Sequence, residues 1–148
     1  MNQDFRKSVV YQIYPKSFRD TNGDGTGDLR GVIEKLDYLG ELGVDYIWLT
    51  PFFVSPQNDN GYDVEDYYKI DPAYGTMKDV EELIAEAGRR DIRVMFDMVF
   101  NHVSTRHEWF RKAMEGDPYY KEFFFFKKGK PNGSAPTDWE SKFGGSAW

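Results

Sequence analysis

The 148-residue sequence contains no cysteine, which excludes disulfide bonds and any metal site built on thiolates. It has no apolar run near the length of about 18 residues that a membrane-spanning helix needs, and its first residues lack the apolar segment of a signal peptide. Basic residues are also too few for a nucleic-acid-binding face: 19 Lys and Arg stand against 25 Asp and Glu, a formal charge of −6. We therefore expect a cytoplasmic protein that binds neither membranes nor nucleic acid.

The composition is that of a folded protein. Hydrophobic residues make up 40% of the chain and aromatic residues 18%, which distinguishes it from disordered sequences. At this length the chain can form about one domain with a hydrophobic core.

Three short runs rich in β-branched and aromatic residues predict buried strands, at residues 8–14, 44–50 and 92–100. Proline follows the first two runs directly, at Pro15 and Pro51. We expect the chain between these strands to form helices and loops.

Helices are predicted between consecutive strands. Residues 29–39, with Asp28 as the N-cap, carry one apolar face, formed by Val32, Leu36 and Leu39. A capping box at residues 76–79 opens the second helix, whose expected buried face consists of Val80, Leu83, Ile84 and Ala87. Arg89 and Arg90 fall at its end, where cations suit the helix dipole.

The remaining segments carry weaker signals. Residues 52–75, rich in Asp, Asn and Pro, are expected to be a long loop. Residues 107–115 suggest a short helix. The aromatic segment around Phe123–Phe126 suggests the core of an inserted subdomain, with sugar stacking as the alternative.

The alternation of strand and helix predicts an α/β fold with a parallel sheet. Three strands form either a small α/β domain or the front of a larger (β/α)₈ barrel, which needs roughly 200 residues or more. The chain is therefore too short to form a whole barrel.

Oxygen-bearing side chains alternate along residues 20–28, as in the first nine positions of an EF-hand loop. The expected ligands of a structural Ca²⁺ (or Mg²⁺) are Asp20, Asn22, Asp24, the backbone of Thr26, and Asp28. The twelfth position is Gly31, so the bidentate glutamate is missing. The alternative is a turn held by its own side-chain to backbone hydrogen bonds. The glycine spacing is not that of a dinucleotide-binding turn, and we expect no organic cofactor.

Two further clusters could bind a ligand. The first is the run Asp59–Asp63, which offers carboxylates for hydroxyl groups and the aromatic face of Tyr62 for a sugar ring, or else forms a polar turn with a packed tyrosine. Asp97 is expected inside the third strand, where a charge is costly unless paired. Asn101 and His102 follow at the carboxyl end, where α/β proteins place binding groups, although a lone histidine is more often structural.

The motifs combine into a family resemblance. In order, the sequence reads VVYQIYPKSF, DTNGDGTGDLRGVIEKLDYL, LGVDYIWLTPFF, SPQNDNGYDVEDY, GTMKDVEELI, DMVFNHVSTRHEWF and WESKFGGSAW. From about Val9 to Trp148 it resembles the amino-terminal part of the α-amylase family (glycoside hydrolase family 13), in its α-glucosidase and oligo-1,6-glucosidase branch. The strings SPQNDNGYD, DMVFNH with STRHEWF, and WESKFGG look most like those of members that hydrolyse trehalose 6-phosphate.

The resemblance implies a (β/α)₈ barrel with a domain B inserted after the third strand. Residues 1–101 would then be the first three β/α units, and residues 102–148 the start of domain B. The rest of the barrel would be this chain's natural partner. Because its strand edges would be unpaired, we expect the piece alone to have an exposed apolar patch, to self-associate or to be marginally stable.

The resemblance also implies roles for individual residues. The expected glucose ligands at subsite −1 are Asp59, Tyr62 and His102. Asp97 would support the site, and Phe143 would form an aromatic wall beside the scissile bond. Residues 20–28 match the family's calcium loop. Lys142, next to Phe143, is our candidate for binding a substrate phosphate; the alternative is a solvent-exposed lysine.

No catalytic residue is expected within this chain. Family members cleave with an aspartate nucleophile and a glutamate acid after later strands, and a retaining mechanism holds these carboxyl groups about 5–5.5 Å apart. We therefore expect the parent protein to release glucose and glucose 6-phosphate from trehalose 6-phosphate, and this piece alone to be inactive. The alternatives are isomaltose-type substrates, or a non-catalytic partner protein of the same fold, a class that carries a membrane anchor not seen here.

Overall fold

The computed structural model describes residues 5–148 and divides into two compact units, Met1–Glu108 and Trp109–Trp148. Our boundary between residues 101 and 102 was drawn from family resemblance, and it stays a prediction. Within residues 5–148, every helix is too short or too polar to cross a membrane.

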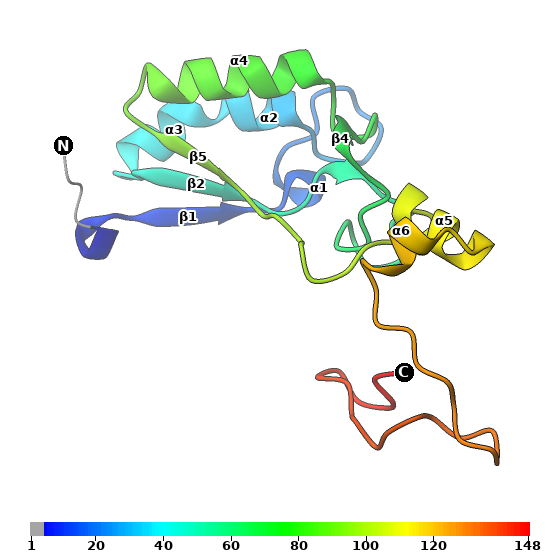
Figure 1. Ribbon diagram of the computed structural model, residues 1–148. Coiled ribbons are helices and arrows are strands. Elements are labelled where there is room, and N and C mark those ends of the chain that lie inside the picture. Colours follow the sequence, from blue (N-terminus) through cyan, green and yellow to red (C-terminus); the bar gives the residue numbers. More distant parts are fainter. Residues whose placement is uncertain (1–4) are drawn as a thin grey trace. The chain divides into compact units, whose positions relative to one another are not determined.

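A three-stranded parallel sheet forms the centre of the first unit (Figure 1). Its strands are β1 (Val10–Ile13), β2 (Tyr46–Leu49) and β5 (Arg93–Phe96), in the spatial order β1-β2-β5. The prediction of a parallel α/β sheet is confirmed. In register across the sheet, the last row is Ile13, Leu49 and Phe96.

Each strand is shorter than its predicted run. β5 ends at Phe96, so the expectation that Asp97 lies inside a strand is wrong: Asp97 directly follows the strand and is half-buried. The apolar run continues to Phe100, but this part of the chain leaves the sheet. Asp97 therefore sits at the carboxyl edge of the sheet.

The helices α2 (Leu29–Glu34), α3 (Leu36–Glu41) and α4 (Met77–Gly88) lie together on one side of the sheet (Figure 1). The predicted helix over residues 29–39 is interrupted at Lys35, which separates α2 from α3. Its predicted apolar face is nevertheless confirmed, because these three residues are fully buried: Val32, Leu36 and Leu39. α4 packs beside α2.

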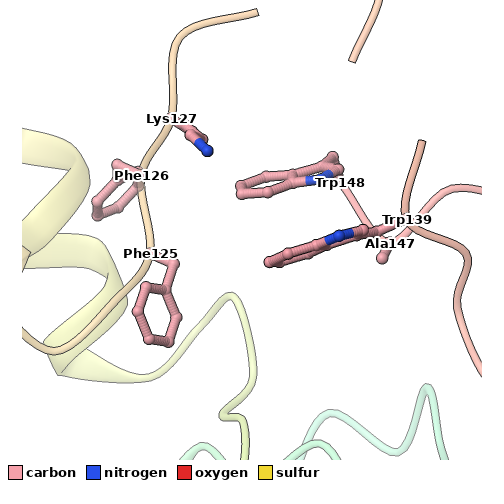
Figure 2. A pocket seen from close by; sticks show the side chains of 6 residues that line it. All are labelled: Phe125, Phe126, Lys127, Trp139, Ala147 and Trp148. Atoms are coloured by element: carbon pink, nitrogen blue, oxygen red, sulfur yellow. The ribbon is translucent and has the colours of Figure 1, made fainter. Parts of the chain in front are cut away.

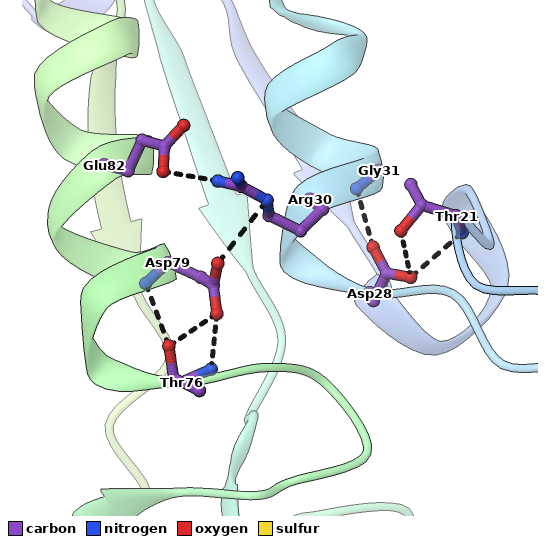
Figure 3. A network of polar contacts seen from close by, with 7 residues as sticks. All are labelled: Thr21, Asp28, Arg30, Gly31, Thr76, Asp79 and Glu82. Atoms are coloured by element: carbon purple, nitrogen blue, oxygen red, sulfur yellow. Dashed lines mark hydrogen bonds and ion pairs between the residues drawn. The ribbon is translucent and has the colours of Figure 1, made fainter.

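α4 begins at the predicted capping box. The side chain of Thr76 accepts a hydrogen bond from Asp79 N (3.3 Å), and the Asp79 carboxylate accepts one from Thr76 N (2.8 Å). In Figure 3, Arg30 of α2 reaches across to Glu82 and Asp79 of α4. The expectation that Ile84 is buried is wrong, since its side chain is 47% exposed. It follows Leu83 by one residue, and the helix therefore turns it away from the core.

The core lies between the sheet and the helices. Its sheet side includes Ile13, Ile47 and Leu49, all buried. Apolar side chains also remain exposed, at Val10 on β1 and at Phe100 beyond β5. The expected apolar patch, self-association and marginal stability of the isolated piece stay predictions.

The loop predicted over residues 52–75 contains an antiparallel pair of strands, so that expectation is wrong. β3 (Phe53–Val54) pairs with β4 (Asp66–Ile70). β3 has only two residues, too few for a recognisable alternation of polar and apolar side chains. Short helices η1 (Phe5–Lys7) and α1 (Pro15–Phe18) were also not predicted.

The second unit contains α5, which begins at the unit boundary (Glu108–Glu115), and α6 (Pro118–Lys121). The first confirms the short helix expected at residues 107–115. The expectation of a buried aromatic core around Phe123–Phe126 is wrong for this chain, because Phe123, Phe125 and Phe126 are exposed. Residues 122–148 form no helix or strand beyond one isolated bridge.

Aromatic rings nevertheless gather in the second unit (Figure 2). The rings of Trp139 and Trp148 stack, with centroids 5.8 Å apart and planes 22° apart. They face a cavity of about 540 Å³, lined by Phe125, Phe126, Lys127, Trp139, Ala147 and Trp148. This cavity belongs to the second unit alone.

Candidate functional site

The turn between β3 and β4 is fixed by the carboxylate of Asp63. Its oxygens accept hydrogen bonds from Ser55 Oγ (2.8 Å), Asn58 N (2.9 Å) and Asp59 N (3.1 Å). Burial raises the pKa of Asp63, but these hydrogen bonds outweigh it and leave the pKa below its usual range. Asp63 is therefore ionised at neutral pH.

Gly61 allows the same turn to pass close to the chain after β2. Its φ is +97°, a left-handed conformation that favours glycine. A Cβ at this position would lie 2.8 Å from the carbonyl oxygen of Pro51. The close approach places Tyr62, the next residue, beside the carboxyl edge of the sheet.

Tyr62 and Asp97 are in direct contact. The Tyr62 hydroxyl donates a hydrogen bond to Asp97 Oδ2 over 3.2 Å. Burial raises the pKa of Tyr62, and the negative charge of Asp97 raises it further. The hydroxyl therefore keeps its proton and acts as the donor.

His102 contacts the backbone of Tyr62, whereas Asp97 contacts its hydroxyl. The Nε2 atom of His102 is 3.0 Å from the backbone oxygen of Tyr62, and its Nδ1 is 2.6 Å from Nδ2 of Asn101. A carbonyl can only accept and an amide nitrogen can only donate, so Nε2 carries the proton and Nδ1 accepts. The neighbours thus favour one neutral tautomer of His102.

Asp59 belongs to the same turn, three residues before Tyr62. Its backbone oxygen accepts from Tyr62 N over 3.0 Å, and its side chain is exposed. The structure therefore brings together four of the predicted site residues in the first unit: Asp59, Tyr62, Asp97 and His102.

The other two predicted site residues, Lys142 and Phe143, belong to the second unit. Both are exposed, and the ring of Phe143 is 99% accessible. Their place beside Asp59, Tyr62 and His102 stays a prediction.

Sequence reasoning assigned no individual role to two residues that support the site. One is Asp63, described above. The other is Tyr67 on β4, whose hydroxyl donates to the backbone oxygen of Val99 and lies 3.3 Å from that of His102. Burial raises the pKa of Tyr67, which keeps this donor protonated. Both residues lie in the segment that we expected to be a loop. The only sequence feature that could have identified them is the string DVEDY, which begins with Asp63 and ends with Tyr67.

The Asp-rich loop is held by its own side chains. Asp20 accepts hydrogen bonds from the backbone nitrogens of Asn22, Gly23 and Gly25, which lower its pKa. Asn22 and Asp24 each accept from the nitrogen two residues later, over 2.9 and 2.7 Å. These are the contacts of the alternative interpretation, a self-supporting turn.

Asp28 ends this loop and caps α2. Its Oδ1 accepts from Gly31 N (2.7 Å), and its Oδ2 accepts from Thr21 N (2.9 Å) and Thr21 Oγ1 (2.8 Å), as Figure 3 shows. Across the described part of the chain, His, Cys, Asp and Glu side chains form no group of three that could hold a metal ion. A cation here would therefore also need the Asn22 amide and the Thr26 carbonyl.

Comparison with known proteins identifies the family of the chain. Residues 12–148 match the family model "Alpha amylase, catalytic domain". The chain is 61% identical over 97% of its length to trehalose-6-phosphate hydrolase of Bacillus subtilis, covering 26% of that protein. It is 52% identical over its whole length to oligo-1,6-glucosidase of Heyndrickxia coagulans, covering 27%.

A solved structure gives the same result. The trehalose-6-phosphate hydrolase of Bacillus licheniformis superposes with a TM-score of 0.93 at 61% identity, over 99% of this chain and 27% of that one. The chain thus spans about a quarter of the length of the relatives that it matches. A family match over nearly all of its residues, with the parallel sheet and the site at its carboxyl edge, shows that the chain belongs to the α-amylase family, as the amino-terminal part of its catalytic domain.

Proposed function

We propose that this chain is the front of a retaining α-glycoside hydrolase that splits trehalose 6-phosphate into glucose and glucose 6-phosphate. One observation carries the choice of substrate. Two trehalose-6-phosphate hydrolases are 61% and 60% identical to the chain, whereas the oligo-1,6-glucosidases that it matches reach 52% or less.

The first unit supplies the non-reducing glucose site of this enzyme. The Asp59 carboxylate accepts hydrogen bonds from sugar hydroxyls, and the ring of Tyr62 packs against the pyranose. His102 adds a neutral imidazole beside them. The bond from Tyr62 to Asp97 holds the ring in place, because Asp97 is anchored at the end of β5.

Cleavage itself needs two carboxyl groups that flank the glycosidic bond. In our proposal these lie in the part of the parent protein that follows residue 148. The 148-residue piece should therefore show no hydrolysis of either sugar above a blank. Turnover by the piece alone would contradict this assignment.

The substrate is tested with the parent enzyme, offered trehalose 6-phosphate and isomaltose separately. We expect glucose release to favour trehalose 6-phosphate strongly. A preference for isomaltose would instead support an oligo-1,6-glucosidase, the alternative that the second group of relatives favours. Release from neither sugar would support a non-catalytic partner protein.

We propose Lys142 as the phosphate ligand and Phe143 as the aromatic wall next to it. Lys142→Ala in the parent should raise KM for trehalose 6-phosphate and leave KM for an unphosphorylated glucoside unchanged. Lys128→Ala is the matched control, since it removes another exposed lysine of the same unit. An equal effect of Lys142→Ala on both substrates would contradict the proposal.

We further propose that the loop of residues 20–28 takes up a structural Ca²⁺ (or Mg²⁺). Alternating side-chain oxygens from Asp20, Asn22 and Asp24 support it, as does the preference of these cations for oxygen ligands. Ca²⁺ at a hundred times its dissociation constant should stabilise the chain by about 2.7 kcal/mol. The thermal midpoint should therefore rise with Ca²⁺ and fall with a chelator.

The matched variants for this test are Asp24→Asn and Asp138→Asn. Asp24→Asn should abolish the response to Ca²⁺, whereas Asp138→Asn, outside the loop, should keep it. A midpoint that ignores Ca²⁺ in the unaltered protein would favour the self-supporting turn.

A further inference from the structure

The carboxylate of Asp63 collects hydrogen bonds from three points of the turn that carries Asp59. Oδ1 accepts from Ser55 Oγ and from Asp59 N, and Oδ2 accepts from Asn58 N. Ser55 Oγ also accepts from Gln57 N over 3.0 Å, which extends the network by one residue. The segment from Ser55 to Asp59 is thereby bound to a single side chain four residues beyond its end.

This turn has a conformation that would not hold by itself. Gln57 and Asn60 have φ values of 60° and 50°, in the left-handed region. Such a conformation costs about 1–2 kcal/mol for most residues other than glycine, and less for asparagine, so the cost falls mainly on Gln57. Hydrogen bonds to the Asp63 carboxylate offset this cost and restrain the backbone near Asp59.

We propose that Asp63 is a positioning residue for the sugar site: it fixes the backbone of Asp59 so that the Asp59 carboxylate is presented to glucose. This role rests on the function proposed above. Asp63 does not contact the sugar in this proposal, since its oxygens already accept three hydrogen bonds from the turn. It acts only through Asp59.

An ionised carboxylate suits this role better than an amide. All of its hydrogen-bonding positions accept, and all three partners can donate. In Asp63→Asn, one oxygen becomes an NH₂ group that faces a backbone N–H of Asn58 or Asp59. One of these N–H groups then loses its acceptor, and the turn can relax.

The test is a double-mutant cycle in the parent enzyme, with glucose as the titrated ligand in calorimetry. Asp63→Asn should weaken glucose binding by about tenfold, the effect of losing one hydrogen bond to a charged acceptor. In an Asp59→Ala background the same change should have no further effect, because Asp63 acts through Asp59. A purely structural role would give independent, additive losses.

Asp79→Asn is the matched control. Asp79 is also a carboxylate that accepts from a backbone nitrogen and a hydroxyl, but it caps α4. Asp79→Asn should therefore lower the thermal midpoint of unfolding and leave glucose affinity unchanged. If Asp63→Asn also leaves glucose affinity unchanged while Asp59→Ala weakens glucose binding, our inference is overturned.

A second measurement separates this inference from the proposed function. Amide hydrogen exchange of Asn58 and Asp59, relative to that of Val94 in the sheet, should accelerate at least tenfold in Asp63→Asn. Unchanged exchange at both amides would overturn the positioning role, whatever the protein binds. If Asp59→Ala leaves glucose affinity intact, the proposed function fails instead. Should Asp63→Asn not fold, Ser55→Ala serves instead, because it removes the hydroxyl that donates to Asp63 and accepts from Gln57 N. We expect it to accelerate amide exchange at Gln57 and at Asp59. Unchanged exchange at both amides would count against the positioning role of Asp63.

Discussion

The hydroxyl of Tyr62 donates a hydrogen bond to Oδ2 of Asp97 over 3.2 Å, and so joins the turn between β3 and β4 to the end of β5. The two residues are 35 positions apart and belong to different motifs of the sequence. The backbone oxygen of Tyr62 also contacts His102 Nε2, from the segment after β5. The candidate sugar site is therefore an assembly of two segments that meet at the carboxyl edge of one sheet.

The contact predicts an unusual titration of Tyr62. Burial and the charge of Asp97 raise the pKa of its hydroxyl above the ordinary value of about 10. In an ultraviolet titration of the phenolates, Tyr62→Phe should remove one late-ionising group, while the other tyrosines whose pKa burial raises, Tyr67 among them, remain. Asp97→Asn should move one late step toward lower pH, whereas Asp138→Asn should not. If Tyr62→Phe removes no late-ionising group, the assignment is contradicted.

The same shift has a consequence for stability. Because the folded state holds the Tyr62 proton more tightly than the unfolded state, stability from this group is complete below about pH 10 and is lost as the pH rises further. The unaltered protein should therefore lose stability above pH 10 more steeply than Tyr62→Phe. Parallel loss in both proteins would argue against the raised pKa.

Two helical glycines predict opposite effects of one substitution. At Gly31 in α2, a Cβ would lie 2.1 Å from the backbone oxygen of Arg19, whereas at Gly40 in α3 nothing lies within 4 Å. Gly31→Ala should therefore force the backbone apart and cost at least about 2 kcal/mol of unfolding free energy. Gly40→Ala should instead stabilise the chain by about 0.5 kcal/mol, because alanine loses less entropy in a helix. Urea unfolding of both variants tests the pair, and equal signs would contradict it.

The capping box of α4 predicts a measurable cost for losing one hydroxyl. Thr76 Oγ1 accepts from Asp79 N and lies 2.6 Å from Asp79 Oδ2, its own acceptor. Thr76→Ala should lower the free energy of unfolding by about 1 kcal/mol, as at other N-caps. Thr76→Ser keeps the hydroxyl and should cost far less. A loss of equal size in both variants would point to the methyl group instead of the cap.

Much of this fold is predictable from the sequence because it depends on local periodicity. The buried face of Val32, Leu36 and Leu39 follows from helical spacing and survives the interruption at Lys35. The β3–β4 hairpin was not predictable in this way, because Phe53–Val54 is too short to show a period. Ile84 was wrongly predicted to be buried for another reason. Helical spacing identifies an apolar stripe along a helix, but it does not show how much of that stripe the neighbouring elements cover.

The candidate site divides along similar lines. Asp59, Tyr62 and His102 could be named from their motifs, since each carries a group suited to binding a sugar. Asp63 is part of the same motif, but its supporting role was not predictable, because that role depends on which N–H groups the folded turn directs at its carboxylate. Composition also misled us in the second unit, where aromatic residues that suggested a core are exposed in this chain.

Tyr67 provides the last prediction, which concerns how the hairpin is held against the end of the sheet. Its hydroxyl donates to the backbone oxygen of Val99, a buried residue two positions beyond Asp97. In Tyr67→Phe this carbonyl loses its donor, and we expect the free energy of unfolding to fall by about 1 kcal/mol. His102 should also become more mobile, since its backbone oxygen lies 3.3 Å from the same hydroxyl.

The neighbouring tyrosine is the control for this experiment. Tyr68 is on the same strand but 84% exposed, so Tyr68→Phe should leave the free energy of unfolding unchanged. Urea unfolding measures both variants, and the line widths of the His102 ring signals in NMR report its mobility. If Tyr67→Phe matches Tyr68→Phe in both measurements, the hydroxyl does not hold the hairpin to the segment after β5. The position of Tyr62 would then depend on its bond to Asp97 and on the turn that Asp63 restrains.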